Sequence, residues 1–144
     1  MAVEFEPMIG RYFMLEVSGK SYRIYMEEAG RGIPLLCLHT AGSDARQFRH
    51  ILADADITSR FRVMAFDLPW HGKSNPPKDF RNEDYKLTVH GYKAIINAVC
   101  SALELESPVV MGCSMGGRIV CHLALENTAY FRAMIALEGA DKLE

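Results

Sequence analysis

Ser114 lies in a short segment whose residue types suit nucleophilic catalysis. Residues 112–116 read Gly-Cys-Ser-Met-Gly, the G-x-S-x-G pattern in which a sharp turn presents a serine hydroxyl. Three fixed positions often arise by chance, so the argument depends on the flanking residues. The apolar run 108–111 indicates a buried strand before the turn, and apolar residues at helical spacing over 119–123 indicate a helix after it. Such a turn holds its serine in a strained backbone conformation, so we predict that Ser114 is a nucleophile.

Strands and helices alternate along the chain and would position this turn. Aromatic-rich runs around a Gly turn predict an antiparallel hairpin, and the later strands are short and continuously apolar, as in a parallel sheet buried on both faces. The expected strands cover 11–17, 22–27, 35–38, 62–66, 108–111 and 132–137, and the expected helices cover 45–55, 89–103 and the stretch from the serine turn to about 127. The fold class is therefore α/β, with a mostly parallel mixed sheet and helices on both faces.

Two more polar segments follow expected strands, and together with the serine turn they resemble one known family. The first reads Leu-His-Thr-Ala-Gly at 38–42, and the second reads Asp-Leu-Pro-Trp-His-Gly-Lys-Ser at 67–74. In this order, and over essentially the whole chain, the three segments are similar to those of the α/β-hydrolase fold superfamily, in its esterase, lactonase and C–C hydrolase branch. The resemblance implies an α/β-hydrolase fold and a serine hydrolase activity.

The resemblance also implies roles for residues around the serine. The backbone N–H groups of Met115 and Ala41 would form the oxyanion hole, which stabilises the negative charge that develops during acyl transfer. His39, Thr40 and Trp70 would lie at the substrate pocket, with His39 shaping its loop through hydrogen bonds. Thr40 and Trp70 both stand where relatives usually carry a glycine.

Relatives arrange their triad in the order serine, acid, histidine. His122 is the only histidine after Ser114, and eight residues of helix separate the two by about 12 Å, which is too far for a hydrogen bond. His71, which precedes the serine, is expected to have a structural role. Glu138 follows Ser114 by 24 residues, at the end of an expected strand, and resembles the triad acid of some relatives. Asp141, or an acid after a seventh strand, is the alternative.

The histidine base is therefore expected outside this sequence. We expect residues 1–144 to form the N-terminal portion of a single α/β-hydrolase domain, comprising strands one to six, with the cap and the C-terminal portion absent. The apolar strand at 133–137 lacks the charges or prolines that blunt a free sheet edge, so it also calls for a neighbour. A complementary C-terminal polypeptide would carry the catalytic histidine. The chain would then be one of two polypeptides of a processed or nicked enzyme. Alternatively, the sequence is an incomplete part of a longer chain.

The expected activity is cleavage of a small ester, lactone, thioester, amide or activated C–C bond through an acyl-enzyme. A non-catalytic ligand-binding relative, and cofactor-free perhydrolase or oxygen chemistry on the same triad, are the alternatives. No cofactor or metal is expected. The net charge of −2 and the ordinary composition favour neither nucleic acid nor a membrane as a partner, and a cytoplasmic location is expected.

The four cysteines each lie in an apolar run. They are Cys37, Cys100, Cys113 and Cys121, with no CxxC pair and no histidine at ligand spacing. We expect buried free thiols that pack as small apolar side chains, and not disulfides or metal ligands.

Overall fold

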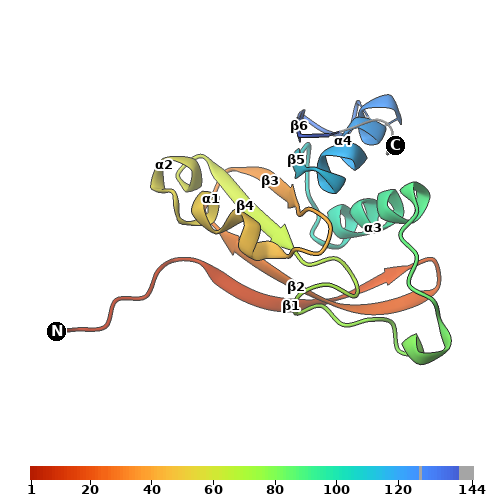
Figure 1. Ribbon diagram of the computed structural model, residues 1–144. Helices are drawn as coiled ribbons and strands as arrows, with labels where there is room; N and C mark the ends of the chain where they lie inside the picture. Colours follow the sequence, from red (N-terminus) through yellow and green to blue (C-terminus); the bar gives the residue numbers. More distant parts are fainter. Residues whose placement is uncertain (127, 140–144) are drawn as a thin grey trace.

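Six strands form one mixed sheet in the computed structural model, which describes residues 1–126 and 128–139 (Figure 1). The strands are β1 (Ile9–Val17), β2 (Lys20–Ala29), β3 (Ile33–Leu38), β4 (Phe61–Phe66), β5 (Val109–Cys113) and β6 (Ala133–Leu137). Their order in the sheet is β1-β2-β4-β3-β5-β6. The β1–β2 and β2–β4 pairs are antiparallel, whereas β4, β3, β5 and β6 run parallel to one another. The predicted hairpin and mostly parallel sheet are therefore confirmed.

Helices cover both faces of the parallel strands, as predicted. The longer ones are α3 (Val89–Ala102) and α4 (Met115–Glu126), and the short ones are η1 (Ala45–Phe48), α1 (Arg49–Ala53), α2 (Ala55–Thr58) and η2 (Phe80–Asn82). Successive residues of a strand point to opposite faces. Leu36 and Met64 accordingly pack with α3 and α4, and their neighbours Leu35 and Val63 pack with η1 and α1. Two apolar cores result, one on each face of the sheet.

The segment 45–58 differs from the single helix expected for 45–55. It forms the three short turns η1, α1 and α2. Asp44 begins the first turn by accepting a hydrogen bond from Arg46 N–H, and Asp54 begins the third by accepting one from Ile57 N–H. Asp54 has extended backbone angles, φ −80° and ψ 116°, so the helical path breaks there and restarts. The Asp54 carboxylate caps a new helix at this point, although the apolar pattern of the sequence favours one continuous helix.

The cysteines are buried only in part. Cys37 and Cys100 are buried, but Cys113 is half-buried and Cys121 is exposed on the outer side of α4. The expectation of burial is wrong for Cys121, because the apolar face of α4 is formed instead by Ile119, Val120 and Leu123. All four thiols are free.

Strand β6 forms one margin of the sheet that the structure describes. It pairs with β5, and its residues Ile135 and Leu137 are 41% and 45% exposed. Such an apolar edge presents unpaired backbone groups that another strand could bind. None of the helices within residues 1–126 and 128–139 combines the length and the apolar character that crossing a bilayer requires.

We predict that Leu36→Ala lowers the free energy of unfolding by about 2–5 kcal/mol, because it leaves a cavity in a core where Leu36 is fully buried. Leu125→Ala is the matched control, since Leu125 is 82% exposed and should change stability by less than about 0.5 kcal/mol. Urea unfolding of the two variants measures both effects. Equal losses would show that the assignment of Leu36 to the core is wrong.

Candidate active site

Ser114 occupies a sharp turn between β5 and α4. Its φ of 54° lies in the left-handed region, which costs a non-glycine residue about 1–2 kcal/mol. Backbone hydrogen bonds hold the turn on both sides. Ser114 N–H donates to the Leu137 carbonyl over 2.8 Å, and Arg118 N–H donates to the Ser114 carbonyl over 2.8 Å to open the helix. The strand, strained turn and helix predicted from the sequence are present, and the side chain of Ser114 is exposed.

Two glycines allow the helix to start this close to the sheet. A Cβ atom on Gly112 would lie within 3.0 Å of the Gly116 carbonyl, and one on Gly116 would lie within 3.0 Å of the Leu38 carbonyl. Backbone therefore packs on backbone where α4 meets the ends of β5 and β3. Any side chain at either position would push the helix away and move Ser114 relative to the loop after β3.

A groove of about 470 Å³ lies beside this turn and brings the two predicted oxyanion residues together. Ala41, from the loop after β3, and Met115, the first residue of α4, both line it. The other lining residues are His71, Tyr85, Leu87, Thr88, Val89, Tyr92, Arg118 and Ile119. N–H groups in the first turn of a helix have no partner within that helix, so Met115 N–H is available to a ligand. The volume suits a small organic molecule.

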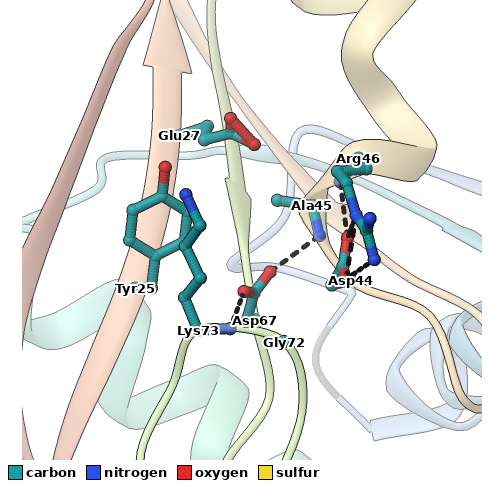
Figure 2. Close-up of a pocket in the computed structure, with 8 residues that line it drawn as sticks. All are labelled: Tyr25, Glu27, Asp44, Ala45, Arg46, Asp67, Gly72 and Lys73. Atoms are coloured by element: carbon teal, nitrogen blue, oxygen red, sulfur yellow. Dashed lines mark hydrogen bonds and ion pairs between the residues drawn. The ribbon is translucent and has the colours of Figure 1, made fainter.

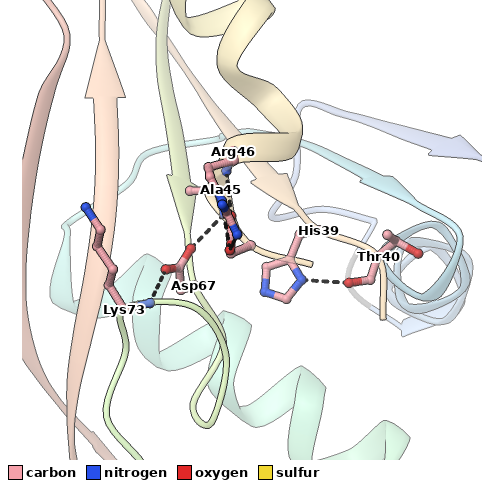
Figure 3. A network of polar contacts seen from close by, with 7 residues as sticks. His39, Thr40, Ala45, Arg46, Asp67 and Lys73 are labelled. Carbon is pink, nitrogen blue, oxygen red and sulfur yellow. Dashed lines mark hydrogen bonds and ion pairs between the residues drawn. The ribbon is translucent and has the colours of Figure 1, made fainter. Parts of the chain in front are cut away.

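His39 anchors the loop after β3 through hydrogen bonds of its ring. Its side chain is 1% exposed, and Nδ1–H donates to the Thr40 carbonyl over 2.8 Å (Figure 3). Nε2 accepts from Leu68 N–H over 3.1 Å. Burial is the main cause that lowers the pKa of the imidazole, so the neutral ring is favoured. His39 therefore shapes the loop through hydrogen bonds, and its ring lies outside the lining of the groove.

Thr40 and Trp70 are also not among the lining residues of the groove. Thr40 is anchored by its N–H, which donates to Gln47 Oε1 over 2.8 Å. Trp70 has a φ of 70°, and its ring contacts those of Phe80 and Tyr85 at centroid distances of 5.8 and 5.7 Å. This left-handed backbone favours glycine, the residue that the resemblance leads us to expect at this position. The tryptophan borders the groove only through Tyr85.

Asp67 organises the turn after β4. Its side chain is 2% exposed, with Oδ1 accepting from Ala45 N–H over 2.7 Å and Oδ2 accepting from Lys73 N–H over 2.8 Å (Figure 3). A Cβ on Gly72 would collide with this carboxylate, and Gly72 has a φ of 51°. One buried charge therefore joins the 67–74 turn to the first residue of η1.

A second recess, of about 380 Å³, lies beside Asp67 and is lined mainly by charged side chains, of which Asp44, Arg46 and Asp67 are hydrogen-bonded (Figure 2). Asp44 binds the guanidinium of Arg46, and the Lys73 ammonium lies 4.8 Å from the centre of the Tyr25 ring. Glu27 faces the same recess, where burial and then the charge of Asp67 raise its pKa. Within the described ranges no group of three His, Cys, Asp or Glu side chains could hold a metal ion. We interpret this recess as structural.

Glu138 follows β6 at the same level of the sheet at which Ser114 follows β5. Cys113 and Leu137 are partners in the β5–β6 register, so Ser114 and Glu138 each follow the last residue of a neighbouring parallel strand. Glu138 is exposed, has a φ of 50°, and its Oε2 lies 3.9 Å from Cys113 Sγ. Asp141, the alternative acid, lies outside the described residues.

Two histidines are near this site in sequence or in space. His71, expected to be structural, lines the groove, where its Nδ1 lies 3.0 Å from the Pro69 carbonyl and its ring packs against that of His39 at 5.1 Å. His122 lies on α4 two turns beyond Ser114, and its Nε2 is buried without a hydrogen-bond partner among the described residues. Neither observation gives Ser114 a triad histidine.

A family model described as alpha/beta hydrolase fold matches residues 33–144. The chain belongs to this family. A 2-hydroxymuconate semialdehyde hydrolase of a Pseudomonas species is 28% identical over 135 residues, which are 93% of this chain and 44% of that protein. An uncharacterised protein of Mycobacterium tuberculosis is 30% identical over 105 residues, covering 73% of this chain and 28% of that one. This chain thus spans less than half the length of these curated relatives.

Solved structures agree with this assignment. A putative aryl esterase from Burkholderia cenocepacia superposes with a TM-score of 0.78 over 93% of this chain and 48% of its own, at 20% identity, which supports the fold. An N-acyl homoserine lactonase is 32% identical, with a TM-score of 0.69 over 88% of this chain and 44% of its own. The alpha/beta hydrolase fold expected from the sequence is therefore confirmed.

Sequence reasoning missed two polar residues of the groove in this alpha/beta hydrolase, Tyr92 and Arg118. Tyr92 falls on the apolar face of the helix expected over 89–103, and its side chain is buried. Its hydroxyl and the Nε of Arg118 are nevertheless buried without a hydrogen-bond partner among the described residues. Two sequence features could have pointed to these residues. One is a tyrosine within an apolar stripe, and the other is an arginine one helical turn after the nucleophile motif.

We predict that His39 makes stability depend on pH. Burial lowers the pKa of His39 below the ordinary 6.5, so protonation favours the unfolded chain, and stability falls as the pH drops below about 6.5 toward the folded-state pKa. His39→Gln removes this titration and should flatten the loss of melting temperature between pH 7.5 and 5.5. The exposed His50 supplies the control, His50→Gln, which should keep the wild-type slope. Identical slopes in all three proteins would contradict the assignment.

Proposed function

We propose that this alpha/beta hydrolase is a serine hydrolase in which Ser114 attacks a carbonyl carbon. The observation that carries the proposal is the strained turn at Ser114, which opens beside a groove lined by Ala41 and Met115. Residues with backbone strain of this kind cluster at functional sites, and the strained conformation persists because the surrounding fold stabilises it. The similarity to proteins named as a hydrolase and a lactonase supports the same chemistry.

The reaction would proceed in two displacements. Ser114 Oγ bonds to the carbonyl carbon while its proton passes to a histidine, and the resulting oxyanion accepts hydrogen bonds from the N–H groups of Ala41 and Met115. The leaving group then takes that proton, which leaves an acyl-enzyme, and water hydrolyses the ester to free the acid. Small esters, lactones, thioesters, amides and activated C–C bonds all suit this sequence of steps.

Glu138 would orient the histidine and stabilise its positive form. The adjacency of β5 and β6, with Ser114 and Glu138 at their carboxyl ends, supports this role. We infer that the histidine comes from a complementary C-terminal part of the enzyme that pairs with the exposed edge of β6. The hydrogen bonds of His39 to Thr40 and Leu68 make that residue unsuitable as the base.

A fluorophosphonate should label Ser114 in the protein that carries this sequence, because the reagent reacts with activated serines. Ser114→Ala should abolish the adduct and lower hydrolysis of a p-nitrophenyl ester by up to roughly 10⁶-fold, the loss seen when a triad loses its nucleophile. Ser107→Ala is the matched control, since Ser107 is also exposed and also has a positive φ, of 43°. Intact mass and ester kinetics measure the two effects.

The same assay tests the source of the base. His71→Gln should keep the adduct, since the proposed histidine lies elsewhere, and loss of labelling in this variant would contradict that part of the proposal. An unlabelled wild-type protein that still binds small ligands would instead indicate a non-catalytic relative.

A further inference from the structure

Two buried donors line the groove beside Ser114 without a partner. Tyr92, on α3, is 2% exposed, and its hydroxyl has no hydrogen-bond partner among the described residues. Arg118, in the first turn of α4, lines the same groove, and its buried Nε is also unpartnered there. Buried polar groups are nearly always hydrogen-bonded, because a buried donor that lacks a partner loses its hydration without compensation. Two such groups on one groove therefore point to a ligand that satisfies both.

The character of the two groups selects the ligand. A guanidinium only donates hydrogen bonds, and burial raises the pKa of Tyr92, so its hydroxyl also remains available as a donor. Two donors, one of them cationic, call for an oxygen that carries negative charge. The described residues that line the groove include no aspartate or glutamate that could supply it, so we assign the charge to the ligand.

The rest of the lining indicates how much charge the ligand carries. Leu87, Val89, Met115 and Ile119 make the wall mostly apolar, and Arg118 is the one lysine or arginine among the described lining residues. A monovalent anion would be matched by this single cation, whereas a dianion such as a phosphate monoester would keep one charge uncompensated in an apolar setting. A planar carboxylate also fits the fork of a guanidinium.

We propose that the substrate of this hydrolase carries a carboxylate at the far end of its acyl group, bound by Arg118 and Tyr92. The inference rests on the proposed function, because it places the scissile carbonyl at Ser114 and the carboxylate at Arg118 and Tyr92, which line the same groove. Apolar carbons between the two groups would contact the aliphatic residues. Arg118 and Tyr92 thereby select the substrate and have no part in the bond-breaking steps.

Two esters that differ only in charge test this selection. The substrates are p-nitrophenyl hydrogen glutarate and the same compound with its free carboxyl group methylated. Arg118→Gln should lower kcat/KM for the anionic ester by about 10- to 100-fold, the effect of a lost charge-assisted hydrogen bond, and change that for the neutral ester by less than about 3-fold. Arg49→Gln, which removes an exposed cation from α1 on the other face of the sheet, should alter neither value.

Tyr92→Phe separates a binding role from a structural one. The hydroxyl has no partner among the described residues, so its removal should leave the melting temperature unchanged or raise it slightly. It should still reduce kcat/KM for the anionic ester by about 3- to 10-fold relative to the neutral one. A fall in melting temperature with no change in the charge preference would overturn the proposal for Tyr92.

Calorimetric titration of the Ser114→Ala protein with monomethyl glutarate, which carries a single carboxylate, keeps this inference apart from the proposed function. Binding of monomethyl glutarate that disappears in the Ser114→Ala, Arg118→Gln double variant supports the carboxylate site even if no ester is hydrolysed. Hydrolysis that needs Ser114 but shows the same charge preference with and without Arg118 would overturn the carboxylate site and would leave the proposed hydrolase activity intact. Absence of both monomethyl glutarate binding and hydrolysis would overturn both.

Discussion

Contact of backbone with backbone at the start of α4 is the constraint on which the site depends. Gly112 and Gly116 let the first turn of the helix rest on the ends of β5 and β3, where a Cβ atom would collide with a carbonyl. This close approach forces the chain to reverse within one residue, and that residue is Ser114, with its φ of 54°. The strain is held by hydrogen bonds and by burial of the two apolar cores, so the serine remains where the fold places it.

The opposite side of the groove depends on buried polar groups. His39 fastens the loop after β3 to Leu68, and Asp67 fastens the turn after β4 to Ala45 and Lys73. The bonds of His39 to Leu68 and of Asp67 to Ala45 join segments that follow the neighbouring parallel strands β3 and β4, at the carboxyl ends where open α/β sheets bind their ligands. These bonds hold the loop that carries Ala41, and the proposed mechanism gives none of their residues a catalytic role. In the proposed oxyanion hole, N–H groups of Ala41 and Met115 held in place in this way would stabilise developing charge without rearrangement.

The sheet, the covering helices and the turn at Ser114 could be predicted because each has a local signature, either apolar periodicity or glycine spacing. The break at Asp54 was missed because the apolar pattern across 45–55 outweighed a capping carboxylate. The burial of His39 and the orphaned atoms of Tyr92 and Arg118 depend on which segments meet in space. Pattern alone assigns Tyr92 to the core, and only the packing of α3 against α4 shows that its hydroxyl is unpaired beside a groove.

A crystal structure of the fluorophosphonate-treated protein tests the central claim most directly. We predict a phosphorus atom bonded to Ser114 Oγ, with its phosphoryl oxygen about 2.7–3.1 Å from the backbone nitrogens of both Ala41 and Met115, the distance at which such donors act. An adduct on another residue would contradict the assignment of the nucleophile. A phosphoryl oxygen turned away from these two nitrogens would contradict the oxyanion hole that the groove is proposed to contain.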